Sequence, residues 1–298
     1  MANVNVASPA ERVNRDNLKQ VQGHIAFARR TPDEEAPECA GGSGYDIAFV
    51  DYDVPIRDAR PIVDELSLDR EGFILVPHPM PCGEERDPDV LKRNYLKEMV
   101  PFVKEYFNAS WVTTTDLGGV NIRSIGGSSF GSSPATDGNQ GEKGRNLVRN
   151  FGAGYAHCDF SPVAAPVVAA RDNQLQGNEI RSYSRLLIIQ TWRVLSPPPQ
   201  DLPLTLCDSS TISDGDLLDV SQNKYGTTGR VWIPHFNNSQ RWYYFPNMTQ
   251  DEFIMFKGYD SDAHYRPNSA HSAFDNRRAY PNAIPRESIE TRFCVYYE

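Results

Sequence analysis

The second half of the chain is a succession of short apolar segments, and this feature limits the fold more than any other. Each segment is rich in Val, Ile, Leu, Tyr, Trp or Phe and ends at residues typical of turns. No helical pattern alternates with these segments, which favours a sandwich or barrel over a parallel α/β sheet. We therefore predict a mainly β fold with helices (α+β): a double-stranded β-helix, or jelly-roll, core flanked by helices from the N-terminal half. The predicted strands cover residues 186–195, 202–208, 229–233, 241–245, 251–257 and 288–297.

The N-terminal half supplies the clearest helix. Asp87 is a typical N-cap residue, Pro88 suits the first helical position, and Asp89 complements the positive end of the helix. From Val90 to Phe107 apolar residues recur at steps of three and four. This spacing predicts one apolar helix face packed on a sheet.

A glycine-rich stretch, residues 40–44, divides the chain into an arm and a domain. Residues 1–44 are predicted to form an N-terminal arm, partly flexible, with a helical opening that carries His24. Residues 45–298 are predicted to form a single domain, because no repeat or linker interrupts the β-rich half. Residues 126–144, rich in Gly, Ser, Asn and Asp, are predicted to be a long mobile loop where a substrate lid could sit.

Net charge and cysteine content disfavour several classes of protein. The formal net charge of −9 argues against nucleic acid or an anionic membrane as a partner. No run of about 20 apolar residues predicts a membrane helix, and the first residues lack the apolar segment of a signal peptide. The five cysteines form no CxxC pair, which favours reduced thiols and a cytoplasmic location. The composition is compatible with a homodimer.

The stretch from Tyr155 to Phe160 carries the first suggestion of chemistry. His157 and Asp159 are two residues apart, so on a strand both side chains point to the same side, and Cys158 points away. One imidazole and one carboxylate are two of the three ligands in the two-His-one-carboxylate triad of non-haem Fe(II) sites. Alone this tripeptide is weak evidence, because the same spacing occurs by chance in many proteins.

A third ligand has to come from a distant strand, and His235, His264 and His271 are the candidates. His271 is favoured because it lies upstream of Arg286 and Ser288, while the other two are readily interpreted as polar loop residues. On a strand, Arg286 and Ser288 face one side and offer a guanidinium fork and a hydroxyl that suit the far carboxylate of a dicarboxylate. A His-x-Asp pair, a distal His and Arg-x-Ser, in this order, are typical of Fe(II)/2-oxoglutarate oxygenases.

Two questions about the pocket stay open at the level of sequence. Arg292 shares the strand parity of Arg286 and is therefore the alternative anchor for the carboxylate. Four more residues are candidates for the pocket wall and equally for core packing or structural ion pairs: Tyr155, Trp192, Arg193 and Arg241.

Several longer runs resemble the fungal hydroxylase/desaturase family of Fe(II)/2-oxoglutarate-dependent oxygenases. That family includes a gibberellin desaturase, proteins related to cephamycin methoxylation and a meroterpenoid endoperoxidase. The resemblance extends over roughly residues 45–298 and is carried by the run from Gln240 to Glu252 together with shorter ones. The shorter runs are residues 56–60, 68–73, 157–162, 192–193, 203–208, 256–261, 271–274 and 285–292.

The resemblance implies Fe(II) bound by His157, Asp159 and His271, with 2-oxoglutarate anchored by Arg286 and assisted by Ser288. It also implies O2 as a cosubstrate and a small-molecule substrate from fungal secondary metabolism. The outcome could be hydroxylation, desaturation or oxidative cyclisation. Two alternatives stay open: an Fe(II) oxidase that does not use 2-oxoglutarate, and a jelly-roll binding protein with a degenerate site. Succinate formation distinguishes the first alternative, and iron binding distinguishes the second.

Overall fold

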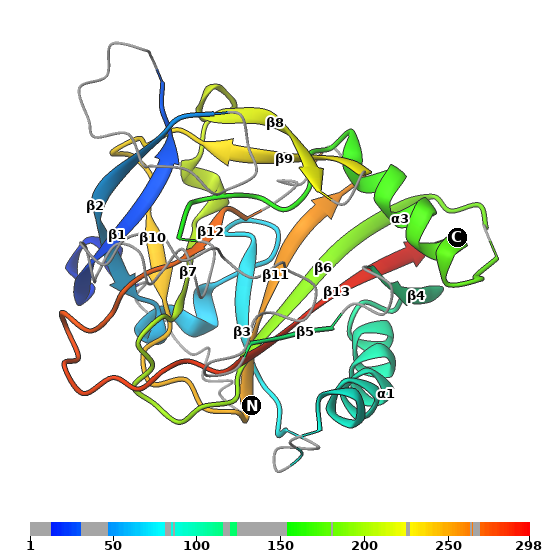
Figure 1. Ribbon diagram of the computed structural model, residues 1–298, viewed down its shortest axis with the longest axis horizontal. Coiled ribbons are helices and arrows are strands. Elements are labelled where there is room, and N and C mark those ends of the chain that lie inside the picture. Colours follow the sequence, from blue (N-terminus) through cyan, green and yellow to red (C-terminus); the bar gives the residue numbers. More distant parts are fainter. Residues whose placement is uncertain are drawn as a thin grey trace, which may run out of the picture.

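The structure, a computed structural model, describes residues 13–30, 47–80, 85, 87–115, 120–123, 154–179, 181–224, 227–262, 264 and 269–298. Strands dominate this part of the chain. They form a five-stranded and a six-stranded sheet that pack against each other, with a separate two-stranded ribbon (Figure 1). Two curled sheets packed face to face are the jelly-roll arrangement that the sequence predicts.

The five-stranded sheet has the order β1-β2-β10-β7-β12. Its strands pair antiparallel except where β10 runs parallel to β2. β12 lies at one edge, so its outer side can pair with another extended segment. The strands are β1 (Gln20–Ala28), β2 (Phe49–Asp58), β7 (Leu204–Cys207), β10 (Trp242–Tyr244) and β12 (His271–Ala273).

The six-stranded sheet has the order β3-β11-β6-β13-β4, and β5 also pairs with β13. Its central strand β6 is buried along almost its whole length, because one face packs on helix α1 and the other on the five-stranded sheet. Burial on both faces explains why this strand reads as a continuous apolar run. The strands are β3 (Phe73–Pro77), β4 (Trp111–Thr114), β5 (Val120–Arg123), β6 (Arg185–Val194), β11 (Glu252–Asp260) and β13 (Ser288–Tyr297).

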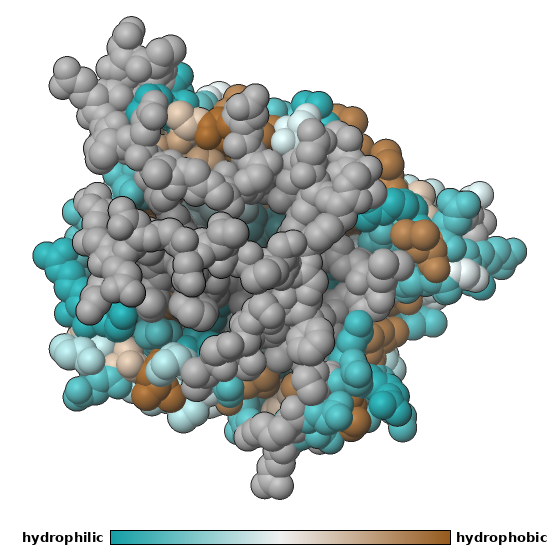
Figure 2. Space-filling model, in the orientation of Figure 1, coloured by the Kyte–Doolittle hydropathy of each residue, from teal (hydrophilic) through white to brown (hydrophobic). Residues whose placement is uncertain are grey.

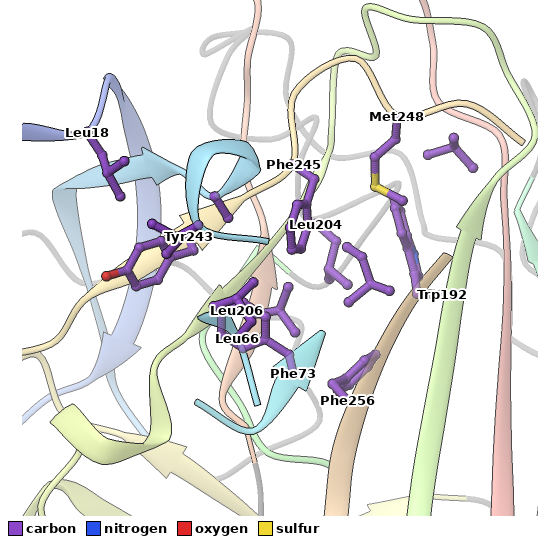
Figure 3. Packing of buried hydrophobic residues seen from close by; sticks show 14 residues of the cluster. Leu18, Leu66, Phe73, Trp192, Leu204, Leu206, Tyr243, Phe245, Met248 and Phe256 are labelled. Carbon is purple, nitrogen blue, oxygen red and sulfur yellow. The ribbon is translucent and has the colours of Figure 1, made fainter. Parts of the chain in front are cut away.

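The core between the two sheets is an apolar cluster that reaches the functional region. Figure 3 shows Trp192 of β6, Leu204 of β7 and Phe256 of β11 within this cluster. All three are nearly or fully buried. A rigid, close-packed wall of this kind holds the side chains beside it in fixed positions.

Helix α1 (Pro88–Tyr106) confirms the predicted helix and its cap. The side chain of Asp87 accepts hydrogen bonds from the backbone N–H groups of Asp89 and Val90. The apolar face of α1 packs on the outer side of the six-stranded sheet. The remaining elements are α3 (Ala164–Leu175), β8 (Leu217–Lys224), β9 (Thr227–Pro234) and the 3-10 helices η1 (Arg15–Asn17), η2 (Arg60–Glu65), η3 (Ser209–Thr211) and η4 (Asp214–Asp216).

Part of the predicted N-terminal arm is an integral strand. Residues 20–28 form β1, which pairs with β2 along its full length, and His24 lies opposite Asp53 in this ladder. The predicted helix at His24 is therefore wrong. Ile25 and Phe27 are fully buried on one face of β1, and Ala26 and Ala28 are buried on the other, so the end of this strand is covered on both faces.

The structure differs from two further expectations, and a third concerns residues outside the described ranges. Residues 154–159 are extended but form isolated bridges to β1, β9 and β12 instead of a regular strand. The sequence also missed α3, so the helices do not all come from the N-terminal half. The predicted lid, residues 126–144, lies outside the described residues.

The described surface is mixed in character. Figure 2 shows hydrophilic residues over most of the described surface on this face, and apolar residues over α3. The exposed apolar side chains of α3 and its N-terminal boundary are Val163, Val167 and Leu175. Within the described ranges, no helix combines the length and hydrophobicity needed to cross a bilayer.

Candidate active site

An isolated pair of backbone hydrogen bonds brings the predicted ligands together. The N–H of His157 donates to the carbonyl of His271 at 3.1 Å, and the reverse bond is 2.9 Å, so the two residues oppose each other at the outer edge of β12. Opposed residues of an antiparallel pair point to the same face, and the two imidazole centroids lie 4.3 Å apart. The Asp159 oxygens lie 3.6 Å from Nε2 of His157 and 3.8 Å from Nε2 of His271.

The main chain fixes the tautomer of both imidazoles. Nδ1 of His157 lies 3.0 Å from the Tyr155 carbonyl, and Nδ1 of His271 lies 3.1 Å from the Ser269 carbonyl. A carbonyl can only accept, so each Nδ1 carries the proton and each Nε2 keeps a lone pair near Asp159. Burial, followed by the neighbouring His271, lowers the pKa of His157 to about 4, so this ring is neutral at pH 7.

The carboxylate of Asp159 remains ionised despite its burial. Burial alone would raise its pKa, but Arg292, followed by the two histidines, outweighs burial and holds the pKa well below the ordinary range. Two neutral imidazole nitrogens and one carboxylate are the ligand types that suit non-haem Fe(II). The Nε2–oxygen separations are close to the roughly 3 Å expected between neighbouring ligand atoms that each lie about 2.1 Å from one ion. Among the described residues, these three are the group whose donor atoms could hold an ion.

A cavity of about 50 Å³ opens beside the triad. The Arg286 guanidinium lines it and lies across the ring of Trp192, with its carbon 5.6 Å from the ring centroid. Leu204 and Phe256 add apolar walls, and Phe256 also packs against the ring of His271 at 4.9 Å. The other lining residues are His157, Ser272, Ala273, Glu290 and Arg292.

Comparison with known proteins places this arrangement in a family. The model of the oxidoreductase/YMDC permease-like domain matches residues 19–296. The Fe(II)/2-oxoglutarate-dependent dioxygenase nvfI of Aspergillus novofumigatus is 30% identical over 254 residues, which cover 82% of this chain and 83% of that protein. The chain belongs to the Fe(II)/2-oxoglutarate-dependent dioxygenases.

Further relatives agree with this assignment. The hydroxylase/desaturase efuI of Hormonema carpetanum is 28% identical, with 82% of this chain and 83% of the relative covered. A solved structure of the iron and alpha-ketoglutarate-dependent endoperoxidase NvfI matches with a TM-score of 0.71 and 25% identity, over 93% of this chain and 97% of that chain. The predicted family and fold class of this dioxygenase are confirmed, and the His-Asp-His group fits the iron that such enzymes use.

In this dioxygenase Arg292 of β13 and Arg286, two residues before that strand begins, differ in their surroundings. Arg286 donates from Nη1 to the Leu202 carbonyl at 2.6 Å and lies beside apolar walls. Arg292 is bonded to Asp159 itself. Ser288 is buried and lies opposite Val194 of β6, but it is not among the described residues that line the cavity.

The four candidate wall residues fall into two groups. Trp192 lines the cavity, and the ring of Tyr155 lies 4.9 Å from that of His157. Arg193 points to the opposite face of β6, where its guanidinium bonds the carbonyls of His78 and Gln250 and stacks over aromatic rings. Of the two interpretations that the sequence leaves open for Arg193, these contacts support the structural one. The backbone of Arg241 bonds Asp208 and Thr211 in a loop before β10.

The other histidines and the intervening cysteine lie outside the triad of the dioxygenase. His235 hydrogen-bonds the Ala28 carbonyl through Nδ1, and His264 is exposed and paired with Asp262. Cys158 packs in an apolar cluster on the other side of its segment, as its parity predicts. Burial raises the pKa of its thiol, so it stays protonated at neutral pH.

Sequence reasoning missed two residues that contact Arg292: Gln190 and Glu290. Glu290 could have been found by parity, because it lies two residues before Arg292 on the same face of β13. Gln190 could not, because its position depends on the register between β6 and β13.

Proposed function

We propose that His157, Asp159 and His271 hold Fe(II) in this dioxygenase and that Arg286 holds the far carboxylate of 2-oxoglutarate. The observation that carries the metal assignment is the shared tautomer of the two histidines. Both Nδ1 atoms are committed to main-chain carbonyls, so both Nε2 lone pairs are available beside Asp159. Such outer hydrogen bonds are typical of metal-binding histidines.

The shape and polarity of the cavity support the assignment of Arg286. A 2-oxoglutarate molecule has charged groups at both ends and methylene groups between them. The cavity is lined by His157 and His271 of the triad, by the Arg286 guanidinium, and by the apolar side chains of Trp192, Leu204 and Phe256. Arg292 is the less suitable anchor, because its N–H groups already bond Asp159, Gln190 and Glu290.

The residues of the chain position the reactants and exclude water. When bound, iron and 2-oxoglutarate supply the oxidising chemistry: O2 is reduced, 2-oxoglutarate is decarboxylated to succinate and CO2, and a substrate C–H bond is oxidised. Burial keeps the His157 imidazole neutral, and the packed walls limit the access of solvent to the site.

The substrate we propose is a small-molecule intermediate of fungal secondary metabolism, oxidised by hydroxylation, desaturation or oxidative cyclisation. The names of the relatives support this class: they include hydroxylase/desaturases, a gibberellin cluster GA4 desaturase of Gibberella fujikuroi and an aspirochlorine biosynthesis protein of Aspergillus oryzae.

Anaerobic Fe(II) titration of the full chain tests the metal assignment. We expect His157→Ala to weaken Fe(II) binding by at least 100-fold, more than the 10- to 100-fold typical of outer-shell changes. His264→Ala is the matched control, because His264 is exposed and lies outside the triad. Equal Fe(II) affinity of wild type and His157→Ala would refute the proposal. Substrate oxidation without succinate would favour an oxidase that does not use 2-oxoglutarate.

A further inference from the structure

Arg292 makes an unusual set of contacts beside the proposed metal site. Its Nε and Nη2 both donate to Oδ2 of Asp159, at 3.1 and 2.8 Å. Its Nε also donates to Oε1 of Gln190 at 2.9 Å, and its Nη2 to Oε1 of Glu290 at 2.9 Å. One guanidinium therefore joins the Asp159 carboxylate to two acceptors on the six-stranded sheet.

The two oxygens of Asp159 are consequently unequal. Oδ2 receives both hydrogen bonds from Arg292 and lies 3.8 Å from Nε2 of His271, whereas Oδ1 lies 3.6 Å from Nε2 of His157. A planar guanidinium fixes the orientation of a carboxylate much better than an ammonium group does, because its N–H donors point in set directions. The contact thus determines which oxygen is presented to a metal.

The acceptors behind Arg292 hold its guanidinium in place. Gln190 lies directly opposite Arg292 in the register of β6 with β13, and its side chain is buried. A bulge in β11 puts Gly258 next to it, where an added Cβ would lie 3.1 Å from Nε2 of Gln190. Glu290 shares the inner face of β13 and supplies a negative charge that offsets the positive charge of Arg292.

We propose that Arg292 is a positioning residue for Asp159, and that Gln190 and Glu290 fix it so that Oδ1 of Asp159 is the oxygen that binds the metal. This inference rests on the proposed assignment of Asp159 as a ligand. Glu290 has a distinct part in this arrangement: an uncompensated arginine beside a ligand carboxylate would repel a divalent cation, and the Glu290 carboxylate reduces that repulsion.

Arg292→Lys separates positioning from charge. Lysine keeps the positive charge but loses the planar fork. We expect Arg292→Lys to weaken binding of Fe(II), and of Co(II) as a spectroscopic probe, by about 10- to 100-fold, the usual cost of losing an outer-shell partner. The visible absorption of the Co(II)-loaded protein should also change, because the carboxylate can then bind through a different oxygen or through both. Arg277→Lys, the same substitution in the arginine–carboxylate pair of Arg277 and Asp275 outside the cavity, should leave metal affinity within about 2-fold of wild type.

Wild-type metal affinity and an unchanged Co(II) spectrum in Arg292→Lys would overturn the proposal. Circular dichroism establishes that each variant is folded. If Arg292→Lys does not fold, Glu290→Gln tests the same arrangement, since it keeps the side-chain shape and removes the compensating charge. We expect Glu290→Gln to weaken metal binding several-fold, and wild-type affinity would overturn the proposal. Failure of the metal assignment itself gives a different pattern, in which wild type and His157→Ala bind the ions equally.

Discussion

Arg286 and Arg292 share one face of the same chain segment, yet their surroundings are opposite in character. Arg286 lies against the ring of Trp192 and donates to the Leu202 carbonyl. Arg292 lies among two carboxylates and an amide. A cation beside apolar walls suits an anionic ligand from solution, while a cation surrounded by protein acceptors suits the orientation of a protein group. Strand parity identifies both residues but does not distinguish these roles.

Substitution of Arg286 gives the largest effect that this comparison predicts. Arg286→Ala removes the charge-assisted pairing with the far carboxylate of 2-oxoglutarate, a loss of about 2–5 kcal/mol for a buried charge pair. We expect the KM for 2-oxoglutarate to rise by roughly 30-fold or more, with Fe(II) affinity unchanged. Steady-state succinate formation at varied 2-oxoglutarate concentrations measures the effect.

Arg292→Ala tests whether the two arginines have these different roles. It should impair metal binding much more than it changes the KM for 2-oxoglutarate. If Arg292→Ala instead raised this KM more than Arg286→Ala does, the two assignments would have to be exchanged.

A third arginine, Arg193, has a structural role. It lies on the face of β6 opposite to Trp192, which lines the cavity. Its guanidinium is fully buried, donates to the carbonyls of His78 and Gln250, and lies 5.1 Å from the Phe253 ring centroid. Arg193→Met leaves these carbonyls without their donor, so we expect a loss of about 2–3 kcal/mol in the free energy of unfolding. Urea unfolding measures this loss. The KM for 2-oxoglutarate of the folded variant should stay at the wild-type value, and a large rise would contradict the structural role.

Local patterns predicted the elements that local physics determines. The cap at Asp87 and the continuous apolar run of β6 identified a helix and a central strand, and parity identified the pair His157 and Asp159. The strand β1 was missed because it depends on pairing with β2, which is distant in the sequence. The close approach of His157 to His271, and the contacts of Arg292 with Asp159 and Gln190, depend on pairings between segments more than 100 residues apart, which no local pattern encodes.

We expect the smallest effect at a second arginine–carboxylate cluster, which lies outside the triad. Glu71 is fully buried and accepts hydrogen bonds from Arg15, Arg70 and the backbone N–H of Ser67. Burial alone would raise its pKa, but these bonds outweigh burial and lower it from the ordinary value of 4.5. Because the folded-state pKa is the lower one, the ionised carboxylate stabilises the fold above about pH 4.5, and this contribution is lost as the pH falls through the folded-state pKa.

Glu71→Gln should therefore reduce the free energy of unfolding at pH 7 by about 1–2 kcal/mol, and the difference from wild type should shrink as the solution is acidified below about pH 4. Urea unfolding across this range measures the change, with Glu105→Gln, an exposed position on α1, as the control. A constant difference at all pH values would contradict the linkage. Fe(II) affinity should be unchanged in Glu71→Gln. The carboxylate of Glu71 contacts arginines and a backbone N–H, whereas the Asp159 carboxylate that Arg292 bonds also faces two imidazoles.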